Sequence, residues 1–493
     1  MRGIVRIVTL VLLCNPILSQ NEADVLRYST TDIFGSARFE AMAGSFGGLG
    51  ADISAIQINP ASMGRFSSSR ASFSMNASFL GNKGLFNAVE TQSNDSKYAV
   101  SAVGAVITTD ISHRNTGRRY NQITLGYTRL KNFSNKRKYE GQNFNSLLEV
   151  LAADGFGIDP DYIYDDRPFT TGLAYDVYAI DYDAGTGEYI PRLTMGDMYH
   201  KREISTDGGI GEFHIGYSEN YMNKLYYGAS IGIRRVNYEE RYTHNERLLE
   251  PAGVSLLSFD YDYHQKTSGT GLNLKLGLLY LVTDELRLGL AFETPTVFRL
   301  KDAWTNDMTA LHDYGVETIK PEYIPHGNYE YRIKSPMKLR GSFAYILGMK
   351  TAINVDLEMA RLPGGRLRSS SEDEYLGIGY DFKIENEEIS RQFRTILNTR
   401  IGVEHMLFND FYIRGGLALL PQPYKKEIGN VNTMNMTYSV GVGWENRFFY
   451  VDASYRLLQL HSDYYAFDPS RIENKTEFKS NLHSIVITAG LKF

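Results

Sequence analysis

Four basic residues occur within short segments in which polar and apolar residues alternate. Arg287, for example, stands between Leu286 and Leu288, so it lies on the polar face of a predicted strand. A basic side chain on such a face can hold the anionic end of a bound molecule or pair with a carboxylate of the same interior. The candidates for ligand contact are Lys275, Arg287, Lys338 and Arg340, and the carboxylates available for pairing are Glu293, Asp356, Glu358 and Glu404.

The histidines give no comparable signal for catalysis or metal binding. The chain has 10 of them, without an HExxH motif or a clustered His, Cys and Asp spacing. A haem receptor would need a histidine pair on its long loops, where His200, His244, His312 and His326 are only scattered. A membrane phospholipase would need a serine beside a histidine such as His405, and no such pair is evident. We therefore expect no catalytic residues, no metal site and no cofactor.

Period-2 alternation of apolar and polar residues predicts 14 β-strands. A soluble sandwich gives the same alternation strand by strand, so the connections have to separate the two interpretations. Tight turns such as 222–223 and 348–350 alternate with long polar segments, of which 133–208 is the longest. An even strand number with short turns on one side only is typical of a membrane-spanning β-barrel. The predicted strands are 69–80, 97–109, 118–132, 209–221, 224–241, 259–282, 286–303, 328–347, 351–361, 388–407, 411–420, 434–445, 448–459 and 481–493.

Composition is compatible with this class and excludes others. The 493 residues include 52 Lys+Arg and 57 Asp+Glu, a formal net charge of −5, so no basic surface for nucleic acid is expected. Arg2 and Arg6 accompany an apolar run that ends at Leu13, which predicts a secretory signal over 1–19, cut near Ser19. Cys14 falls inside it, and a lipoprotein site there is the alternative. After residue 20 no apolar run approaches 18 residues, so no helical span is predicted.

Both ends of the predicted mature chain carry further signals. The last strand ends on Phe493, and an aromatic C-terminal residue resembles the signal by which outer-membrane barrels are recognised for assembly. The segment 20–66 is rich in small residues and contains Gly47, Gly50 and the turn Asn59-Pro60-Ala61. Small residues allow close backbone packing, and a lumen of 14 strands is too wide for side chains alone to fill. We therefore expect 20–66 to be a plug and 67–493 to be the barrel.

Several loose motifs in order resemble the FadL/TodX family of outer-membrane transporters for hydrophobic compounds. They are 35–63 closing on Asn59-Pro60-Ala61, then 286–295 with 298–301, 335–339 leading into 356–358, 400–404, and 413–416 before Pro421. The resemblance implies a 14-stranded antiparallel transmembrane β-barrel with an N-terminal hatch. It further implies passive passage of long-chain fatty acids or other hydrophobic molecules, captured in an outer groove and released through a side opening into the membrane. Partners would be the lipid ligand, outer-membrane lipid and the barrel-assembly machinery, with a monomeric protein in the outer membrane of a Gram-negative bacterium.

Two features of the sequence bear on that expectation. An amphipathic helix is predicted at 143–154, with Phe144, Leu147, Leu148 and Leu151 on one face, and it is a candidate for the capture groove or for packing on the barrel rim. Arg38, in the hatch, can contact ligand or anchor the hatch to a wall carboxylate. The alternative function is a FadL-like barrel that acts as a carrier or docking protein in protein secretion or surface attachment. Gly104 and Gly126, inside early strands, are candidates for a bend.

Overall fold

The computed structural model describes residues 22–493 except 115, 194–197, 251–252, 254, 409, 426–433 and 468–474. The predicted signal segment 1–19 and Cys14 lie outside the described residues. Among the residues that are described, no helix is long and apolar enough to cross a membrane.

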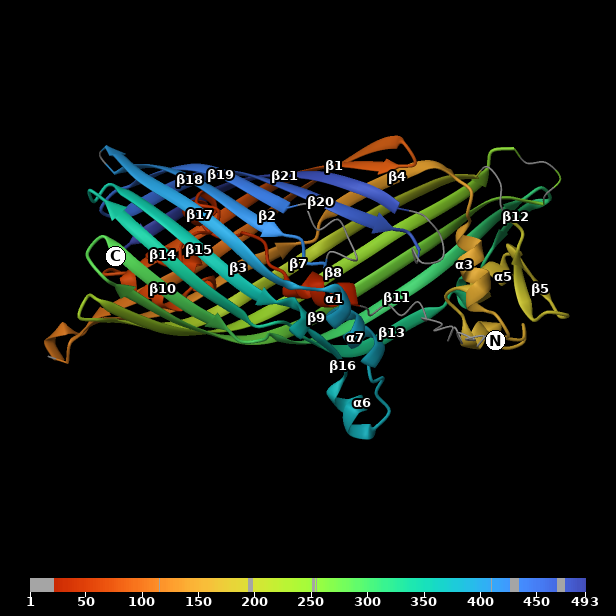
Figure 1. Ribbon diagram of the computed structural model, residues 1–493, viewed down its shortest axis with the longest axis horizontal. Helices are drawn as coiled ribbons and strands as arrows, with labels where there is room; N and C mark the ends of the chain where they lie inside the picture. The colour runs from red at the N-terminus through yellow and green to blue at the C-terminus, as the bar shows by residue number, and fades with distance from the viewer. Residues whose placement is uncertain are drawn as a thin grey trace, which may run out of the picture.

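The described chain forms a closed antiparallel barrel of 14 strands, as predicted, because β1 pairs with both β2 and β21. We call each of the 14 wall-spanning units a stave. Three staves are each built from two consecutive strands that flank a proline, and a fourth is built from β3 and β4 (Figure 1). In chain order the barrel strands are β1 (Arg70–Phe86), β2 (Val89–Asp110), β3 (Arg118–Asn132) with β4 (Asn135–Asn143), β7 (Met198–Tyr221), β8 (Leu225–Leu248), β9 (Leu256–Leu281), β10 (Leu286–Glu293) with β11 (Val297–His312), β13 (His326–Lys334) with β14 (Lys338–Leu347), β15 (Thr351–Arg361) with β16 (Arg366–Ser369), β17 (Thr395–Phe408), β18 (Phe411–Pro421), β19 (Met434–Glu445), β20 (Phe449–Tyr465) and β21 (Lys475–Lys492).

Prolines interrupt three neighbouring staves at one height. Pro295 separates β10 from β11, Pro336 separates β13 from β14, and Pro363 lies between β15 and β16. The register places the three breaks side by side, since Glu293 pairs with Lys338 below them and Val297 with Lys334 above. Proline has no N–H to donate to a sheet ladder, so the predicted strands 286–303 and 328–347 are each split in two.

Two other predicted segments need correction. The range 388–407 begins in a helix, α7 (Lys383–Gln392), and the strand starts only at Thr395. The predicted loop 133–208 contains β4 and the first part of β7, because these strands extend well beyond the turn region and pair with each other. The sheet is therefore taller on this side than alternation alone indicated.

Strand β9 shows how the interior is layered. Its outward residues are apolar from Leu272 to Tyr280, each 38–57% exposed, and become polar from Thr270 toward Asp262. This belt of nine residues has the length of a membrane-spanning β-segment. The inward residues, read upward from Leu279, meet the hatch, then a belt of charged side chains at Lys275, then an apolar layer, and finally an outer cluster that contains Tyr261.

The hatch lies inside the barrel, which agrees with the predicted plugged fold. It has little regular structure, and its core is formed by buried residues that include Ile33, Phe39, Met42, Phe46 and Met63. Helix α1 lies about midway along the barrel, above the rest of the hatch (Figure 1). The elements of this segment are α1 (Glu22–Ser29), α2 (Ala37–Ala41), η1 (Ile53–Gln57) and η2 (Pro60–Arg65).

At the opposite end from the C-terminus, residues 146–193 form a small folded body that we call the cap (Figure 1). It consists of α3 (Leu147–Asp154), α4 (Ile163–Asp166), α5 (Thr171–Asp176) and the ribbon of β5 (Ile180–Asp183) with β6 (Glu188–Pro191). A second helical excursion, α6 (Ser371–Leu376) followed by α7, projects from the side of the barrel. The remaining short elements are β12 (Gly315–Thr318), η3 (Ser112–Arg114), η4 (Pro321–Tyr323) and η5 (Leu362–Gly364).

Candidate functional site

The hatch is attached to the wall by charge-assisted hydrogen bonds. Arg38 donates from Nε and Nη2 to the two oxygens of Glu404, at 2.8 and 2.7 Å, which is the bidentate geometry that arginine prefers. Burial lowers and the Glu404 charge raises the pKa of Arg38, and the net direction is upward. Of the two roles considered for Arg38, the structure places it in the wall contact. Glu40 forms a second such pair, 3.1 Å from Arg456 Nε.

Asn59 organises the turn that closes the hatch. Its Oδ1 accepts from the backbone N–H of Ala61, which caps the short helix η2 that begins at Pro60. Its Nδ2 donates to the carbonyls of Gly47 and Leu278, each at 3.0 Å. One amide therefore ties the turn to another part of the hatch and to the barrel wall, which agrees with a structural role.

Two hatch glycines are required by geometry. At Gly47 a Cβ atom would lie 2.1 Å from Ser342 Oγ, while the backbone N–H groups of Phe46 and Gly47 donate to Asp356 Oδ2 at 2.8 and 3.1 Å. Gly50 has a φ of +72°, a conformation that side chains other than glycine adopt rarely. Both positions let the hatch backbone approach its neighbours closely.

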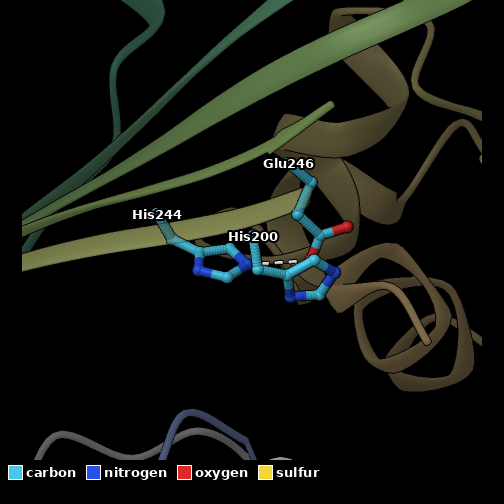
Figure 2. Close-up of side chains that lie close together, drawn as sticks. All are labelled: His200, His244 and Glu246. Atoms are coloured by element: carbon cyan, nitrogen blue, oxygen red, sulfur yellow. Dashed lines mark hydrogen bonds and ion pairs between the residues drawn. The ribbon is translucent and has the colours of Figure 1, made fainter. Parts of the chain in front are cut away.

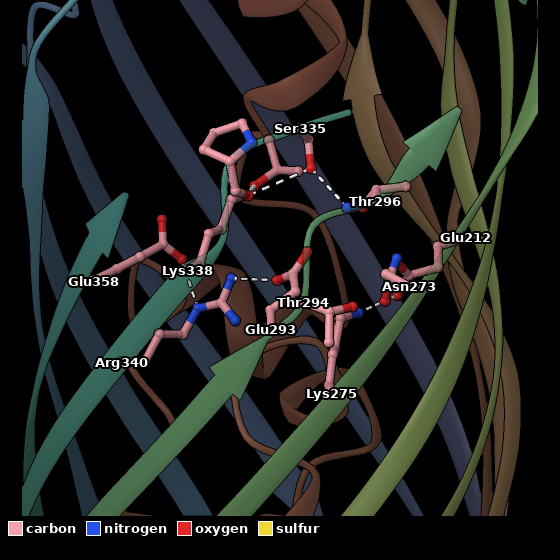
Figure 3. Close-up of polar contacts among 12 residues, drawn as sticks. Glu212, Asn273, Lys275, Glu293, Thr294, Thr296, Ser335, Lys338, Arg340 and Glu358 are labelled. Atoms are coloured by element: carbon pink, nitrogen blue, oxygen red, sulfur yellow. Dashed lines mark hydrogen bonds and ion pairs between the residues drawn. The ribbon is translucent and has the colours of Figure 1, made fainter. Parts of the chain in front are cut away.

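Directly above the hatch, charged side chains of alternating sign form a row along the wall, which we call the charge belt (Figure 3). Arg234 Nε donates to Glu212 at 2.9 Å and its Nη2 to Glu293 at 2.5 Å. Arg340 continues the row by bonding Glu293 at 2.8 Å and Glu358 at 2.6 Å. Every member is at most 5% exposed. The belt consists of Glu212, Arg234, Lys275, Glu293, Lys338, Arg340, Glu358 and Arg400.

The charge belt carries more positive than negative charge. Five of its members are basic and three are acidic, and nearby Asp32 and Lys131 offset each other. Buried Asp356 pairs in register with Arg400 and adds a fourth carboxylate, which accepts from the backbone N–H groups of Phe46 and Gly47. The surplus is most evident at Arg400, whose Nη2 lies 3.7 Å from Glu358 while Nε and Nη1 have no hydrogen-bond partner. Buried guanidinium donors without partners are costly, so this position is suited to an anion.

The structure places the four predicted cations in different surroundings. Lys275 pairs with Glu212 and Arg340 with two carboxylates, whereas Lys338 Nζ has a long contact of 3.4 Å to Thr31 Oγ1. Arg287 lies lower, beside the hatch, and donates to the Leu49 carbonyl at 3.3 Å. Sequence reasoning missed Arg234 and Arg400, although both occupy inward positions of alternating segments.

Above the charge belt the lumen is mostly apolar, with a few buried polar groups such as Asp302 and Gln265, and helix α1 occupies it. Val25 and Tyr28 of α1 are buried among the wall residues of this layer, which we call the apolar sleeve. The Tyr28 ring contacts Phe133 and Tyr238 edge-on, with centroids 6.1 and 6.4 Å apart. Between the hatch and the charge belt lies a cavity of about 20 Å³, which is room for about one water molecule. The sleeve includes Phe133, Val236, Tyr238, Phe298, Leu300, Tyr331, Ile333 and Leu367.

The predicted helix at 143–154 differs from the observed α3. The helix begins at Leu147 after an N-cap at Ser146, because Asn143 still belongs to β4. Leu147, Leu148 and Leu151 are buried in the cap core as one face, but Phe144 precedes the helix and is 65% exposed. The three leucines therefore pack inside the cap, and they do not line an open groove in this conformation.

On the lipid side, the wall has an apolar hollow of about 1010 Å³ across β20, β21, β1, β2, β3, β7 and β8. Gly104 and Gly126 pair with each other at its floor, and Ile53 of the hatch lies against Gly104 from inside. Beside them, His214 is 5% exposed and neither of its ring nitrogens has a hydrogen-bond partner. The wall between hatch and lipid is thus thin at this glycine pair.

Several solved structures share this architecture. A FadL homologue of Pseudomonas aeruginosa superposes with a TM-score of 0.56 at 12% identity, covering 93% of this chain and 99% of its own. The toluene transporter TodX of P. putida gives a TM-score of 0.54 at 13% identity, and TbuX of Ralstonia pickettii gives 0.50 at 13%; each covers 94% of this chain and 99% of its own. The protein therefore has their fold. No family model matches the sequence, and no curated protein does.

Proposed function

We propose that this protein is a member of the FadL/TodX family that moves hydrophobic molecules with an anionic head group, long-chain fatty acids in particular, across the outer membrane by passive diffusion. The observation that supports the substrate class is the positive surplus at the base of the apolar sleeve. An apolar layer solvates the hydrocarbon tail, and the unpartnered donors of Arg400, with Lys338 nearby, satisfy the carboxylate. A neutral aromatic hydrocarbon carries no charge that the surplus basic groups could bind.

The closed lumen indicates what has to move. A cavity of 20 Å³ holds no fatty acid, so α1 leaves the apolar sleeve when the tail enters it. The contacts that this movement would break include the bond from Lys131 Nζ to the Arg27 carbonyl at 2.9 Å, the Arg27 guanidinium 4.4 Å from the Tyr238 ring centroid, and the bond from Gln392 Nε2 to Glu22 at 3.1 Å. The ligand then leaves sideways through the wall at the Gly104–Gly126 pair and enters the apolar hollow. The apolar outward residues of β2 and β3 would receive it there.

The remaining sequence-based expectations belong to this proposal. Export through a signal over 1–19 follows from the N-terminal sequence, assembly guided by Phe493 from the aromatic C-terminal residue, and a monomeric state from the family resemblance. Phe493 is 71% exposed, and its N–H bonds the Ser69 carbonyl at 3.0 Å, so its ring is free for another protein to contact. The proposed roles of Lys275 and Arg340 are to hold the neighbouring carboxylates and so keep Arg400 free.

The test is uptake of a labelled long-chain fatty acid by cells with and without the gene, together with Arg400→Gln. We expect deletion to abolish the uptake that depends on this protein. Arg400→Gln should reduce fatty-acid uptake about tenfold or more, because a charged hydrogen bond contributes roughly 1.5–3 kcal/mol, while toluene entry stays unchanged. Arg287→Gln, which changes a lumen cation below the charge belt, is the matched control.

The outcomes separate the alternatives. Equal losses for fatty acid and toluene would show that Arg400 supports the fold and does not select anions. Unchanged fatty-acid uptake on deletion, with impaired export of a surface protein, would replace transport by the secretion-carrier function.

A further inference from the structure

Two of the histidines that are scattered in the sequence meet in the structure. His200 on β7 pairs directly with Glu246 on β8, and Arg202 with His244. Because residues two apart on a strand share a face, His200, His244 and Glu246 all point inward, and each is at most 1% exposed. Figure 2 shows the three side chains converging below the cap. Their ligand atoms lie within 4.8 Å of one another.

The cluster lies outside the membrane-spanning part of the barrel. Outward residues of β8 are apolar at Ile231 and Ile233 but polar from Arg235 onward, and His244 is nine residues further along the strand. The cap covers the cluster, since Glu246 accepts from the Ser146 hydroxyl at 2.5 Å and from the Leu147 N–H at 2.8 Å. Glu246 therefore holds the first turn of α3 as well as facing the histidines.

The polar contacts leave a coordination position open. His200 Nε2 is buried, has no hydrogen-bond partner and faces Glu246 Oε1 at 3.6 Å. A ring N–H of His200 bonds the Asn145 backbone, and because Nε2 has no partner this N–H is Nδ1, which leaves the lone pair of the neutral ring on Nε2. A lone pair that faces a carboxyl oxygen is satisfied by a cation between them, either a proton on Glu246 or a bound metal ion. His244 Nε2 lies 2.8 Å from the same oxygen, which completes a triangle of donors.

We propose that His200 Nε2, His244 Nε2 and Glu246 bind a divalent transition metal of the Zn²⁺ class. Two imidazoles and one carboxylate are a known ligand set for zinc, and they leave the fourth position to water. Separations of 2.8 and 3.6 Å between ligand atoms bracket the value of about 3.3 Å expected for tetrahedral bonds of about 2.0 Å. The metal would fasten the cap to β7 and β8 through the carboxylate that already holds α3.

Arg202 sets the condition for binding. Its Nε donates to His244 Nδ1 at 3.1 Å, so the neutral ring has its proton on Nε2, where the metal would bind. Metal binding at Nε2 therefore requires the other neutral tautomer, in which the proton has moved to Nδ1 and Arg202 Nε has turned away from the ring. The bonds of Arg202 Nη1 to Tyr464 Oη and to the Ala466 carbonyl, at 3.0 and 3.1 Å, can remain.

The experiment is titration of the purified full chain with CoCl₂ and with ZnCl₂ at pH 8, followed by metal analysis. Burial raises the pKa of Glu246 to about 8, so this pH leaves a substantial carboxylate fraction. We expect one ion per chain, visible absorption typical of tetrahedral Co²⁺, and a loss of affinity of at least 100-fold in His200→Ala. His264→Ala is the matched control, because His264 pairs with Glu239 at 2.8 Å on the same sheet without a second histidine.

Folding of each variant is checked by heat-dependent migration on gels, which a folded barrel shows independently of metal. Absence of stoichiometric metal in the folded wild type would overturn the proposal. So would equal affinity of the wild type and a folded His200→Ala. If His200→Ala does not fold, His200→Gln, which keeps a polar side chain of similar size, takes its place with the same expected loss.

Discussion

The hatch and the cap close opposite ends of one barrel, and they are held by different forces. The hatch meets the wall through directional contacts such as the Arg38–Glu404 and Glu40–Arg456 pairs. The cap has an apolar core of its own, which continues onto inward residues of β9 and β11 such as Phe259 and Met308. A directional interface fixes one position, and the loss of a single partner destabilises it strongly. An apolar interface distributes its stability over many contacts.

The largest effect is expected from Glu40→Gln in the hatch. This change leaves Arg456, which is 1% exposed, without its carboxylate, and an unpaired buried charge costs about 3–5 kcal/mol. The hatch should loosen, and efflux of a small dye from reconstituted vesicles should rise. Glu90→Gln, in the exposed pair with Lys83, should leave efflux unchanged. Unchanged dye efflux from vesicles with Glu40→Gln would show that the hatch does not depend on this pair.

For the cap we expect Leu148→Ala to cost about 2–5 kcal/mol, as for other large-to-small changes at fully buried sites. Because the cap is a separate cluster, protease cleavage within 146–193 should accelerate while dye efflux stays low. Phe144→Ala is the control, since that ring is 65% exposed and its loss should leave cleavage unchanged. Raised efflux in Leu148→Ala would contradict the independence of the two closures.

A smaller effect is predicted for Gly47→Ala. The added methyl group would overlap Ser342 Oγ and displace the backbone that donates to Asp356, at a cost of about 1–3 kcal/mol. Efflux should rise to a lesser degree than with Glu40→Gln. Gly341→Ala tests a glycine next to Ser342 whose Cβ would have nothing within 4 Å, and it should behave as wild type.

Asn59→Ala should have the smallest effect of the four. Loss of an N-cap side chain costs about 1 kcal/mol, and the carbonyls of Gly47 and Leu278 lose a shared donor. We expect a slight rise in efflux that is the same with and without Leu148→Ala, because the two sites share no contacts. An efflux above that of Glu40→Gln would mean that the turn, and not the ion pairs, secures the hatch.

The local sequence pattern was sufficient to predict the strands of the barrel but not the points at which prolines interrupt them. Alternation and turn parity predicted 14 strands, because both follow from the two-residue period of a strand with one lipid-facing side. The prolines at 295 and 336 were visible in the sequence, yet the continuing apolar pattern on both sides concealed the breaks. In the segment 388–407, Ile389, Phe393 and Ile396 have the i, i+4, i+7 spacing of a helix face, and all three pack in the apolar sleeve. The strand alternation further along the segment concealed this signal.

The candidate site was predictable only in part. An inward cation such as Arg340 can be read from alternation, but its partners depend on which strands become neighbours. Arg400 was overlooked for that reason, since its lack of a partner is a property of the assembled wall. The approach of His200 to Glu246 depends on the register of two 24-residue strands, and a slip of one residue would turn one of them outward.

The three aligned prolines have a mechanical consequence. A closed barrel resists stretching because hydrogen bonds between strands form continuous hoops around it, and the row at Pro295, Pro336 and Pro363 lacks three N–H groups along one short arc. Under load the barrel should therefore yield first along this arc, where hydrogen bonds between the strands are missing. A pulling experiment that unravels the chain from its C-terminus should show the staves β10–β11, β13–β14 and β15–β16 each giving way in two steps.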